Sequence, residues 1–198
     1  MILGLHGPVS SGKDEVASVL VSVLGWKRVA FADRIRRHAE IINPFVVSVR
    51  ERLVTYVEKH GWDEAKKNPE VRGILQNIGQ GAADCYGDDV HTRPASRDIA
   101  KHVNDGDCVV VTDVRRESDA AVIHRMGGRI AFVMRPGVGP VNGHKVETPL
   151  NPQLADMFIG NTGSVEELHK CVLSIAFTMS NKMPIEKGRL FCTGEYST

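Results

Sequence analysis

Residues 7–14, with the letters GPVSSGKD, have the residue types and the spacing of a phosphate-binding loop. Gly7, Gly12 and Lys13 match G-x-x-x-x-G-K, in which backbone N–H groups point at phosphate oxygens and the lysine reaches the outer phosphates. The alternative is an ordinary strand-to-helix turn that contains glycines. An apolar stretch before the loop and helical apolar spacing after it favour the P-loop. It predicts nucleotide binding by Gly7, Ser10, Ser11, Gly12, Lys13, Asp14 and Glu15.

Asp14 occupies the position where most P-loops carry Ser or Thr. A carboxylate there would hold Mg²⁺ directly or through water. As a purely structural residue, Asp14 would instead be an acid in the first helical turn, where it stabilises the helix dipole. Both interpretations stand at this point.

A second group of charged residues follows the apolar run 108–112. Asp113, Arg115 and Arg116 come at the end of a predicted strand, and ligands of parallel sheets bind at the carboxyl ends of strands. Asp113 would bind the water shell of Mg²⁺, and an arginine there would clamp a phosphate bidentately. The alternative is a strand-end turn with solvated charges.

Two predicted helices carry further candidates for binding an anion. Asp33 lies where a strand gives way to a helix, and Arg34 and Arg37 share one face of that helix. A later helix places three polar residues on one face: Arg72, Gln76 and Gln80. In both helices, an ordinary solvated face is the alternative.

Residues 136–152 form a predicted loop rich in proline and glycine. A loop of that length within a compact domain is usually functional or disordered. It contains His144 and Glu147, which suggest metal binding or acid–base chemistry. One histidine and one carboxylate are a weak zinc signal, so a polar loop is the competing interpretation.

The remaining pattern alternates strands with helices, which indicates an α/β fold with a parallel sheet covered on both faces. The tail 183–198 gives no prediction. The predicted strands are 1–6, 27–32, 108–114, 129–135 and 157–161. The predicted helices are 13–25, 33–42, 45–60, 70–86, 95–103, 118–128 and 164–179, with breaks at Pro44, Gly61 and Pro69 and a capping box from Ser164 to Glu167.

The composition fits one globular domain. The chain has 198 residues and a formal net charge of +1, which argues for neither a nucleic-acid nor a membrane partner. No targeting or membrane-spanning pattern occurs, so we expect a cytoplasmic protein. The spacing of its four cysteines fits neither a zinc site nor a disulfide framework, which predicts reduced thiols at Cys85, Cys108, Cys171 and Cys192.

Taken together, the motifs SGKD, FADRIRR, LQNIGQ, VVTDVRR, GGRIAFVMRPG and DMFIGNTGSVEEL resemble the deoxynucleoside monophosphate kinases of bacteriophages. The resemblance covers roughly residues 1–175, and an aspartate after the P-loop lysine is usual in that family. It implies a P-loop kinase fold, a three-layer sandwich with five parallel strands in the order 2-3-1-4-5. A single domain, 1–198, would carry a helical monophosphate-binding region at 33–103 and a lid at 136–152.

The same resemblance implies ATP and Mg²⁺ as cofactors. Asp33, Arg34, Gln76 and Arg115 would line the acceptor site, and the loop 161–164, with Asn161 and Gly163, would border the adenine of ATP. This sequence departs from the family pattern in two segments that could supply cations to stabilise the transition state. The family often carries Lys or Arg before SGKD, and its lid often reads H-x-S-E. Here the letters are VSS at 9–11 and HKVE at 144–147. Arg135 and Lys145 are the best local candidates for these cations.

The expected function is therefore phosphorylation of deoxynucleoside 5′-monophosphates to diphosphates by ATP. Two alternatives remain at this point. One is a P-loop kinase of another phosphorylated small molecule, since phosphomevalonate kinases of the animal type also carry SGKD. The other is a nucleotide-dependent switch without transfer activity. The expected partners are the two nucleotides, with no nucleic acid or membrane; a homodimer is compatible with the sequence, and the host cytoplasm would be the location for a phage-encoded protein.

Overall fold

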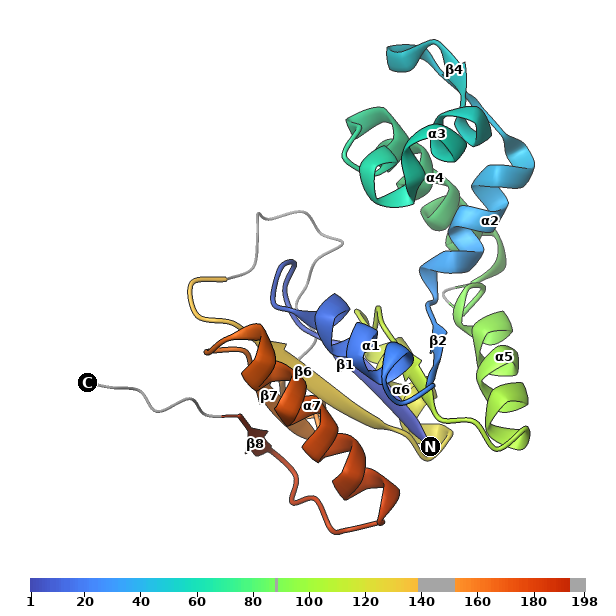
Figure 1. The fold of residues 1–198 in the computed structure, drawn as a ribbon. Helices are drawn as coiled ribbons and strands as arrows, with labels where there is room; N and C mark the ends of the chain where they lie inside the picture. Colours follow the sequence, from blue (N-terminus) through green and yellow to red (C-terminus); the bar gives the residue numbers. More distant parts are fainter. Residues whose placement is uncertain (88, 139–151, 193–198) are drawn as a thin grey trace. The chain divides into compact units, whose positions relative to one another are not determined.

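The computed structural model describes residues 1–87, 89–138 and 152–192. The chain divides into two compact units (Figure 1). Unit 1 comprises Met1–Ala30 and Ser96–Thr198, and unit 2 comprises Phe31–Ala95. Unit 1 contains the predicted P-loop, and unit 2 contains most of the predicted helical region 33–103.

Unit 1 is built on a parallel sheet of six strands, β1 (Ile2–His6), β2 (Lys27–Val29), β5 (Val109–Val111), β6 (Arg129–Met134), β7 (Met157–Gly160) and β8 (Arg189–Phe191). Their order is β2-β5-β1-β6-β7-β8, and all neighbours run parallel. The first five strands confirm the predicted order 2-3-1-4-5. Within the described ranges, the predicted count of five is corrected to six, because β8 pairs with β7 in the tail, where three residues were too few to show a strand pattern.

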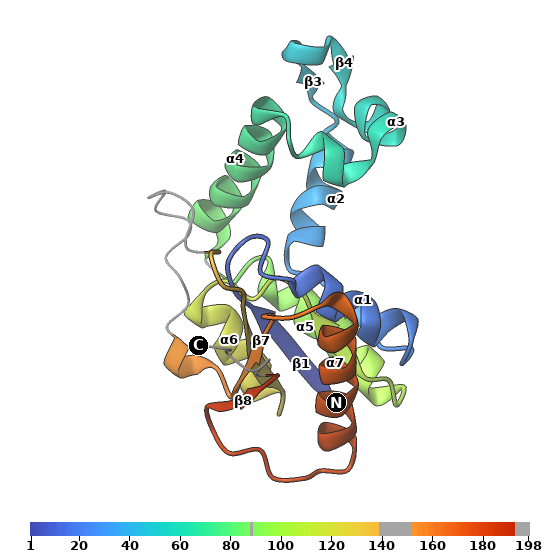
Figure 2. The same cartoon turned by 60° about the vertical axis from the view of Figure 1, so that its left-hand side comes forward.

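Helices cover both faces of this sheet. On one face, α1 (Lys13–Ser22) packs beside α7 (Val165–Ser180), and Leu3 and Leu5 of β1 join their apolar core. On the other face, α6 (Glu117–Arg125) places Ile123 against Gly4. Figures 1 and 2 show this arrangement of α1, α7 and α6 around β1. The three layers explain why residues 2–5 carry no polar side chain in alternation, since a strand of a covered parallel sheet is buried on both sides.

Unit 2 consists of helices around a small apolar core. Its elements are α2 (Ala32–Ile42), β3 (Phe45–Val46), the short 3₁₀ helix η1 (Val47–Val49), β4 (Glu51–Arg52), α3 (Leu53–Ala65) and α4 (Pro69–Tyr86). Helix α5 (Thr92–Asn104) begins in unit 2 and continues into unit 1, and a 3₁₀ turn, η2 (Pro152–Leu154), precedes β7. The core of unit 2 comprises Ala39, Val46, Leu53, Ala65 and Val71.

The predicted helix 45–60 is wrong in its first half, where β3 and β4 form an antiparallel hairpin around η1. The Glu70 carboxylate of α4 accepts the backbone N–H groups of Val47 and Ser48 at 2.8 and 2.7 Å. Arg50 adopts a left-handed φ of 55°, which a helix does not allow. The predicted break at Gly61 is confirmed as a kink inside α3, with φ 75°.

The start of α7 confirms the predicted capping box. The Ser164 hydroxyl accepts the backbone N–H of Glu167, and the Glu167 carboxylate accepts that of Ser164 at 2.7 Å. Both bonds satisfy donors that a helix N-terminus leaves unpaired. The direction in which α7 leaves the loop 161–164 is thereby fixed locally.

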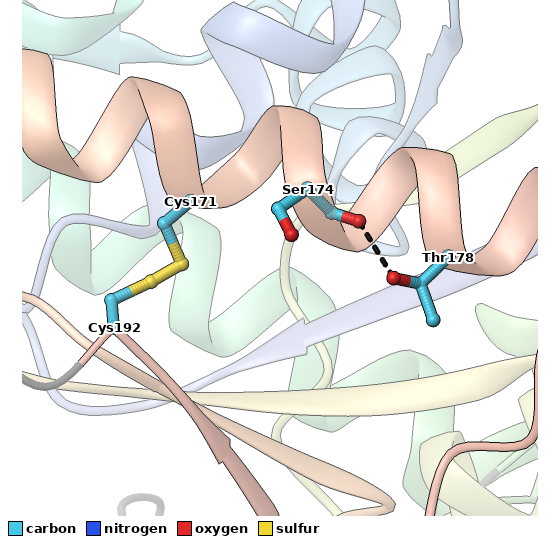
Figure 3. The surroundings of a disulfide bond; sticks show 4 residues. All are labelled: Cys171, Ser174, Thr178 and Cys192. Atoms are coloured by element: carbon cyan, nitrogen blue, oxygen red, sulfur yellow. Dashed lines mark hydrogen bonds between the residues drawn. A yellow bond between two sulfur atoms is a disulfide. The ribbon is translucent and has the colours of Figure 1, made fainter.

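The prediction of four reduced cysteines is corrected by a disulfide between Cys171 and Cys192, whose Cα atoms are 5.8 Å apart (Figure 3). Cys171 lies on α7, and Cys192 follows β8 directly. The pairing depends on β8 joining the sheet, which the spacing of the cysteines does not reveal. Cys85 and Cys108 are free thiols. Among the described residues, the helices are all too short or too polar to cross a bilayer.

Candidate active site

The loop between β1 and α1 has the backbone geometry of a phosphate cradle. Gly7, Ser10 and Gly12 all have positive φ angles, of 147°, 65° and 105°. A Cβ atom on Gly7 would collide with the carbonyl oxygen of Val133, and one on Gly12 with the side-chain amide of Asn161. The two glycines of the motif are therefore required by conformation and by space, and such turns create anion-binding concavities from successive N–H groups.

Lys13 folds back over this loop. Its Nζ donates to the carbonyl oxygens of Gly7 and Pro8 at 2.7 and 2.6 Å. Burial lowers the pKa of Lys13; the neighbouring Asp14 opposes this effect, and the positive charge of Arg115 adds to it. Ser11 is fully buried in the loop, and its Oγ has no hydrogen-bond partner in the described part of the chain.

The carboxyl ends of four parallel strands bring the candidate residues of unit 1 to one edge of the sheet. The P-loop follows β1, Asp113 and Arg115 follow β5, Arg135 follows β6, and Asn161 follows β7. The side chains of Arg115 and Arg135 are exposed, whereas Asp113 is partly buried. Arg115 lies close enough to Lys13 and His6 for its charge to lower their pKa values. This edge thus gathers cations around the cradle.

Arg116 and the two acidic residues after Lys13 have distinct environments. Arg116 is exposed at the N-cap of α6, next to Arg115. Asp14 is exposed in the first turn of α1. Glu15 accepts a hydrogen bond from Nε2 of His169 on α7, over 2.5 Å, so its carboxylate faces α7. No group of three metal-ligating side chains occurs among residues 1–87, 89–138 and 152–192.

Asn161 connects the end of β7 to the cradle. Its Nδ2 donates to the carbonyl oxygen of Ser11 over 3.0 Å, and its backbone N–H donates to Met134 over 2.7 Å. A pocket of about 350 Å³ lies beside it, lined by Gly160, Asn161, Thr162, Gly163, Glu167, Leu168, Lys170, Cys171, Ser174, Phe191 and Cys192. Figure 3 shows three of these lining residues, Cys171 and Ser174 on α7 and Cys192 after β8.

The six candidates of unit 2 lie on α2 and α4, which pack against each other. Arg34, Arg37, Arg72, Gln76 and Gln80 are exposed and Asp33 is partly buried. Three of them bond to a neighbour on their own helix: Asp33 to Arg36 at 3.2 Å, Arg37 to Glu40 at 3.3 Å and Gln80 to Asp84 at 2.8 Å. Their binding roles stay predictions.

Most of the predicted lid, 136–152, lies outside the described residues. This holds for 139–151, and therefore for Lys145, His144 and Glu147. Two residues without a role in the sequence motifs contact the backbone around Arg115: His6 from β1 and Asp119 from α6. The sequence offers one signal for Asp119, because an acidic residue three positions after the N-cap of a helix is typical of a capping box.

Comparison with known proteins gives a match to a family model, a similar viral protein and several similar solved structures. The model of a family described as "Deoxynucleotide monophosphate kinase" matches residues 71–172. A protein of Acanthamoeba polyphaga mimivirus named "Putative deoxynucleotide monophosphate kinase" is 27% identical over 186 residues, covering 88% of this chain and 95% of its own. Among solved structures, a dephospho-CoA kinase from Campylobacter jejuni (12% identity, 91% and 98% of the two chains, TM-score 0.48) and a shikimate kinase from Aquifex aeolicus (15%, 91% and 98%, 0.44) are similar.

Proposed function

Because the chain belongs to the deoxynucleotide monophosphate kinase family and phosphorylates deoxynucleoside 5′-monophosphates to diphosphates, we propose that ATP is its phosphoryl donor and that Arg115 holds the acceptor phosphate. One observation carries this proposal: Lys13 and Arg115 follow the ends of two neighbouring parallel strands, β1 and β5, and Arg115 lies close enough to Lys13 for its charge to lower the pKa of Lys13. Two neighbouring cations suit a reaction in which two phosphate groups must be brought together in line.

The geometry of the P-loop supports a polyphosphate donor. The positive φ angles of Gly7, Ser10 and Gly12 turn the loop into a cradle of N–H groups at the start of α1, where the helix dipole favours negative charge. Ser11 Oγ is buried in the loop and, among the residues that the structure describes, has no hydrogen-bond partner. The Lys13 ammonium, held on two carbonyl oxygens, would exchange them for the outer phosphates.

We place the adenine base in the pocket beside Asn161. The pocket shares Asn161 with the wall of the P-loop, so a nucleotide whose phosphates lie in the cradle can reach it without crossing the sheet. Its volume of about 350 Å³ is within the range of small-ligand sites. Gly163 and the first turn of α7 line it, which agrees with the expectation that the loop 161–164 borders the base.

On unit 1, Arg115, with Arg116 beside it, would bind the phosphate of the deoxynucleotide. On unit 2, the proposed substrate-binding residues are those of the sequence prediction: Asp33, Arg34, Arg37, Arg72, Gln76 and Gln80. Arg135 and Lys145 would neutralise charge on the transferred group, because cations that strengthen their contacts as this charge spreads lower the barrier.

Mg²⁺ fits the residues at this edge of the sheet. Asp14 and Asp113 supply carboxylate oxygens, the ligand type that this ion prefers, and would hold it directly or through water. Bound to the donor phosphates, Mg²⁺ would neutralise their charge and orient them. Asp14 is also an acid in the first turn of α1, and the two roles are compatible.

The near-neutral chain, with a formal net charge of +1, supports a protein whose partners are its two nucleotides rather than a nucleic acid or a membrane. A cytoplasmic location, the host cytoplasm for a phage-encoded chain, and a homodimer belong to the same proposal. Fractionation of expressing cells and light scattering of the purified protein test them.

An ATP-coupled assay across all deoxy- and ribonucleoside monophosphates tests the proposed function. We expect diphosphate formation that requires Mg²⁺ and is strongest with ATP and at least one deoxynucleotide. Equal rates with other nucleoside triphosphates would overturn the choice of donor. ATP hydrolysis that no monophosphate accelerates would instead favour the switch considered above, and turnover of phosphomevalonate alone would favour the other kinase.

A further inference from the structure

We propose that His6 and Asp119 are positioning residues, which hold the backbone of Arg115 so that its guanidinium meets the acceptor phosphate. The proposal rests on the role of Arg115 given above. Neither residue belongs to the motifs that identify the fold. Both are 7% exposed, and they approach Arg115 from opposite sides, His6 from the end of β1 and Asp119 from α6.

The peptide group between Val114 and Arg115 is hydrogen-bonded at both ends. Its carbonyl oxygen lies 2.7 Å from Nδ1 of His6. Because a carbonyl oxygen only accepts, Nδ1 carries the proton and donates it. The N–H of the same peptide group, which belongs to Arg115, donates to Oδ2 of Asp119 over 3.0 Å. This peptide plane therefore cannot rotate without breaking a hydrogen bond to a buried side chain.

The neighbouring peptide groups are held as well. The backbone N–H of Arg116 donates to the same Oδ2 of Asp119 over 2.9 Å, and that of Val114 donates to Leu5 over 3.2 Å. The Arg115 side chain itself is exposed. An arginine whose side chain is free to reach a ligand, but whose Cα is fixed on both sides, has the preorganisation that bidentate phosphate binding requires.

The energetic reason is the length of the arginine side chain. A small rotation of the peptide plane at Arg115 moves the guanidinium by a much larger distance, and a misplacement of about 1 Å in a reacting complex costs about 10²-fold in rate. His6 also directly precedes the P-loop, so β1 sets the donor cradle and the acceptor clamp from adjacent residues. The donor and acceptor phosphate sites thereby keep a fixed position relative to each other.

A purely structural role is the competing explanation, since Asp119 caps α6 and His6 packs against Phe132 with ring centroids 5.0 Å apart. The variants are chosen to separate the two. His6→Leu and Asp119→Ala remove the hydrogen bonds. His6→Asn keeps an amide donor, and Asp119→Asn keeps an oxygen acceptor. Arg115→Ala completes the set, alone and combined with each removal.

The readouts are kcat, the KM values for ATP and for the deoxynucleoside monophosphate, calorimetric binding of the monophosphate, and Tm. We expect His6→Leu and Asp119→Ala each to lower kcat/KM for the monophosphate about 10-fold, chiefly through a higher KM, which lies between no effect and the 10²-fold loss of rate of a full misplacement. The KM for ATP should change within about twofold. His6→Asn and Asp119→Asn should recover most of the loss. In the Arg115→Ala background neither removal should have a further effect, since residues that act through one group are non-additive.

Multiplicative effects in the double variants, or equal rises of both KM values, would show that His6 and Asp119 only support the fold. A loss that follows Tm and is not restored by the conservative variants would show the same. If either His6→Leu or Asp119→Ala prevents folding, the same measurements on the other variant test the proposal. If Arg115→Ala alone leaves monophosphate binding and kcat unchanged, the proposed function of Arg115 fails and the inference with it, an outcome distinct from failure of the positioning alone.

Discussion

Asn161 donates its side-chain amide to the carbonyl oxygen of Ser11 over 3.0 Å and so joins the end of β7 to the P-loop. The two residues are 150 positions apart in the chain. The same amide occupies the space that a side chain at Gly12 would need. The wall of the proposed base pocket and the phosphate cradle are therefore one connected structure.

Removing this hydrogen bond should weaken ATP binding. Asn161→Ala leaves a backbone carbonyl of the P-loop without its donor, which costs about 1–3 kcal/mol, so we expect the KM for ATP to rise about 10-fold with a smaller change for the monophosphate. Asn161→Asp should be worse, because it places a carboxylate beside a carbonyl and near phosphate. Asn181→Ala, which removes a similar side-chain bond to Phe177 at the end of α7, is the matched control. An ATP KM that Asn161→Ala leaves unchanged would contradict the pocket assignment.

Gly12→Ala should abolish activity for two separable reasons, the collision with Asn161 and the left-handed φ of 105°. Combining it with Asn161→Ala removes the collision but leaves the strained backbone, which costs about 1–2 kcal/mol. We expect the double variant to recover part of kcat/KM over Gly12→Ala alone. Steady-state kinetics of the four proteins measure this, and a double variant no better than the single one would mean that the collision is not the cause.

Lys13→Met should lower kcat by about 10²-fold or more, the scale of losing one key electrostatic group in the transition state. The fold should persist, because the variant removes two bonds to loop carbonyls and leaves the apolar core intact. Lys27→Met, at an exposed position at the start of β2, is the control. Near-normal turnover of a folded Lys13→Met protein would refute the P-loop assignment.

Reduction of the Cys171–Cys192 disulfide should destabilise the protein. The bond closes a loop with a sequence separation of 21, for which the chain-entropy model gives about 3 kcal/mol of unfolding free energy. Urea unfolding with and without reductant should show this difference for the wild type and for Cys85→Ser, but not for Cys171→Ser/Cys192→Ser. Peptide mapping under non-reducing conditions that recovers both residues as free thiols would contradict the pairing.

The stability of the protein should depend on pH through His6. Burial lowers its pKa below the usual 6.5, Lys13 and Arg115 act in the same direction, and the bond to Val114 and the Asp119 carboxylate oppose them. Because the unfolded chain then binds a proton more readily than the folded one, His6 makes its full contribution to the free energy of unfolding above pH 6.5. This contribution is lost as the pH falls below 6.5. Relative to His6→Asn, the free energy of unfolding should decline by at most about 1.4 kcal/mol per pH unit. Parallel curves for the two proteins would mean that His6 titrates normally.

The sequence alone determined the features that depend on neighbours along the chain. The P-loop glycines, the Ser164 capping box and the break at Gly61 follow from local backbone conformation, and the structure has each of them. The order of the first five strands, implied by the family resemblance, also holds. In a parallel α/β sheet each strand and helix is long enough to carry its own pattern, so their succession indicates the architecture.

Only the tertiary structure decided the features that depend on distant partners. Glu70 lies 22–23 positions further along the chain than residues 47–48, and its carboxylate binds their backbone N–H groups in a conformation that is not helical. Strand β8 forms because it pairs with the edge of β7. Cys192 reaches Cys171 for the same reason. His6 and Asp119 meet around one peptide group because strands β1 and β5 are neighbours and α6 packs against β1. Such hydrogen bonds join groups far apart in sequence, and no local residue pattern contains them.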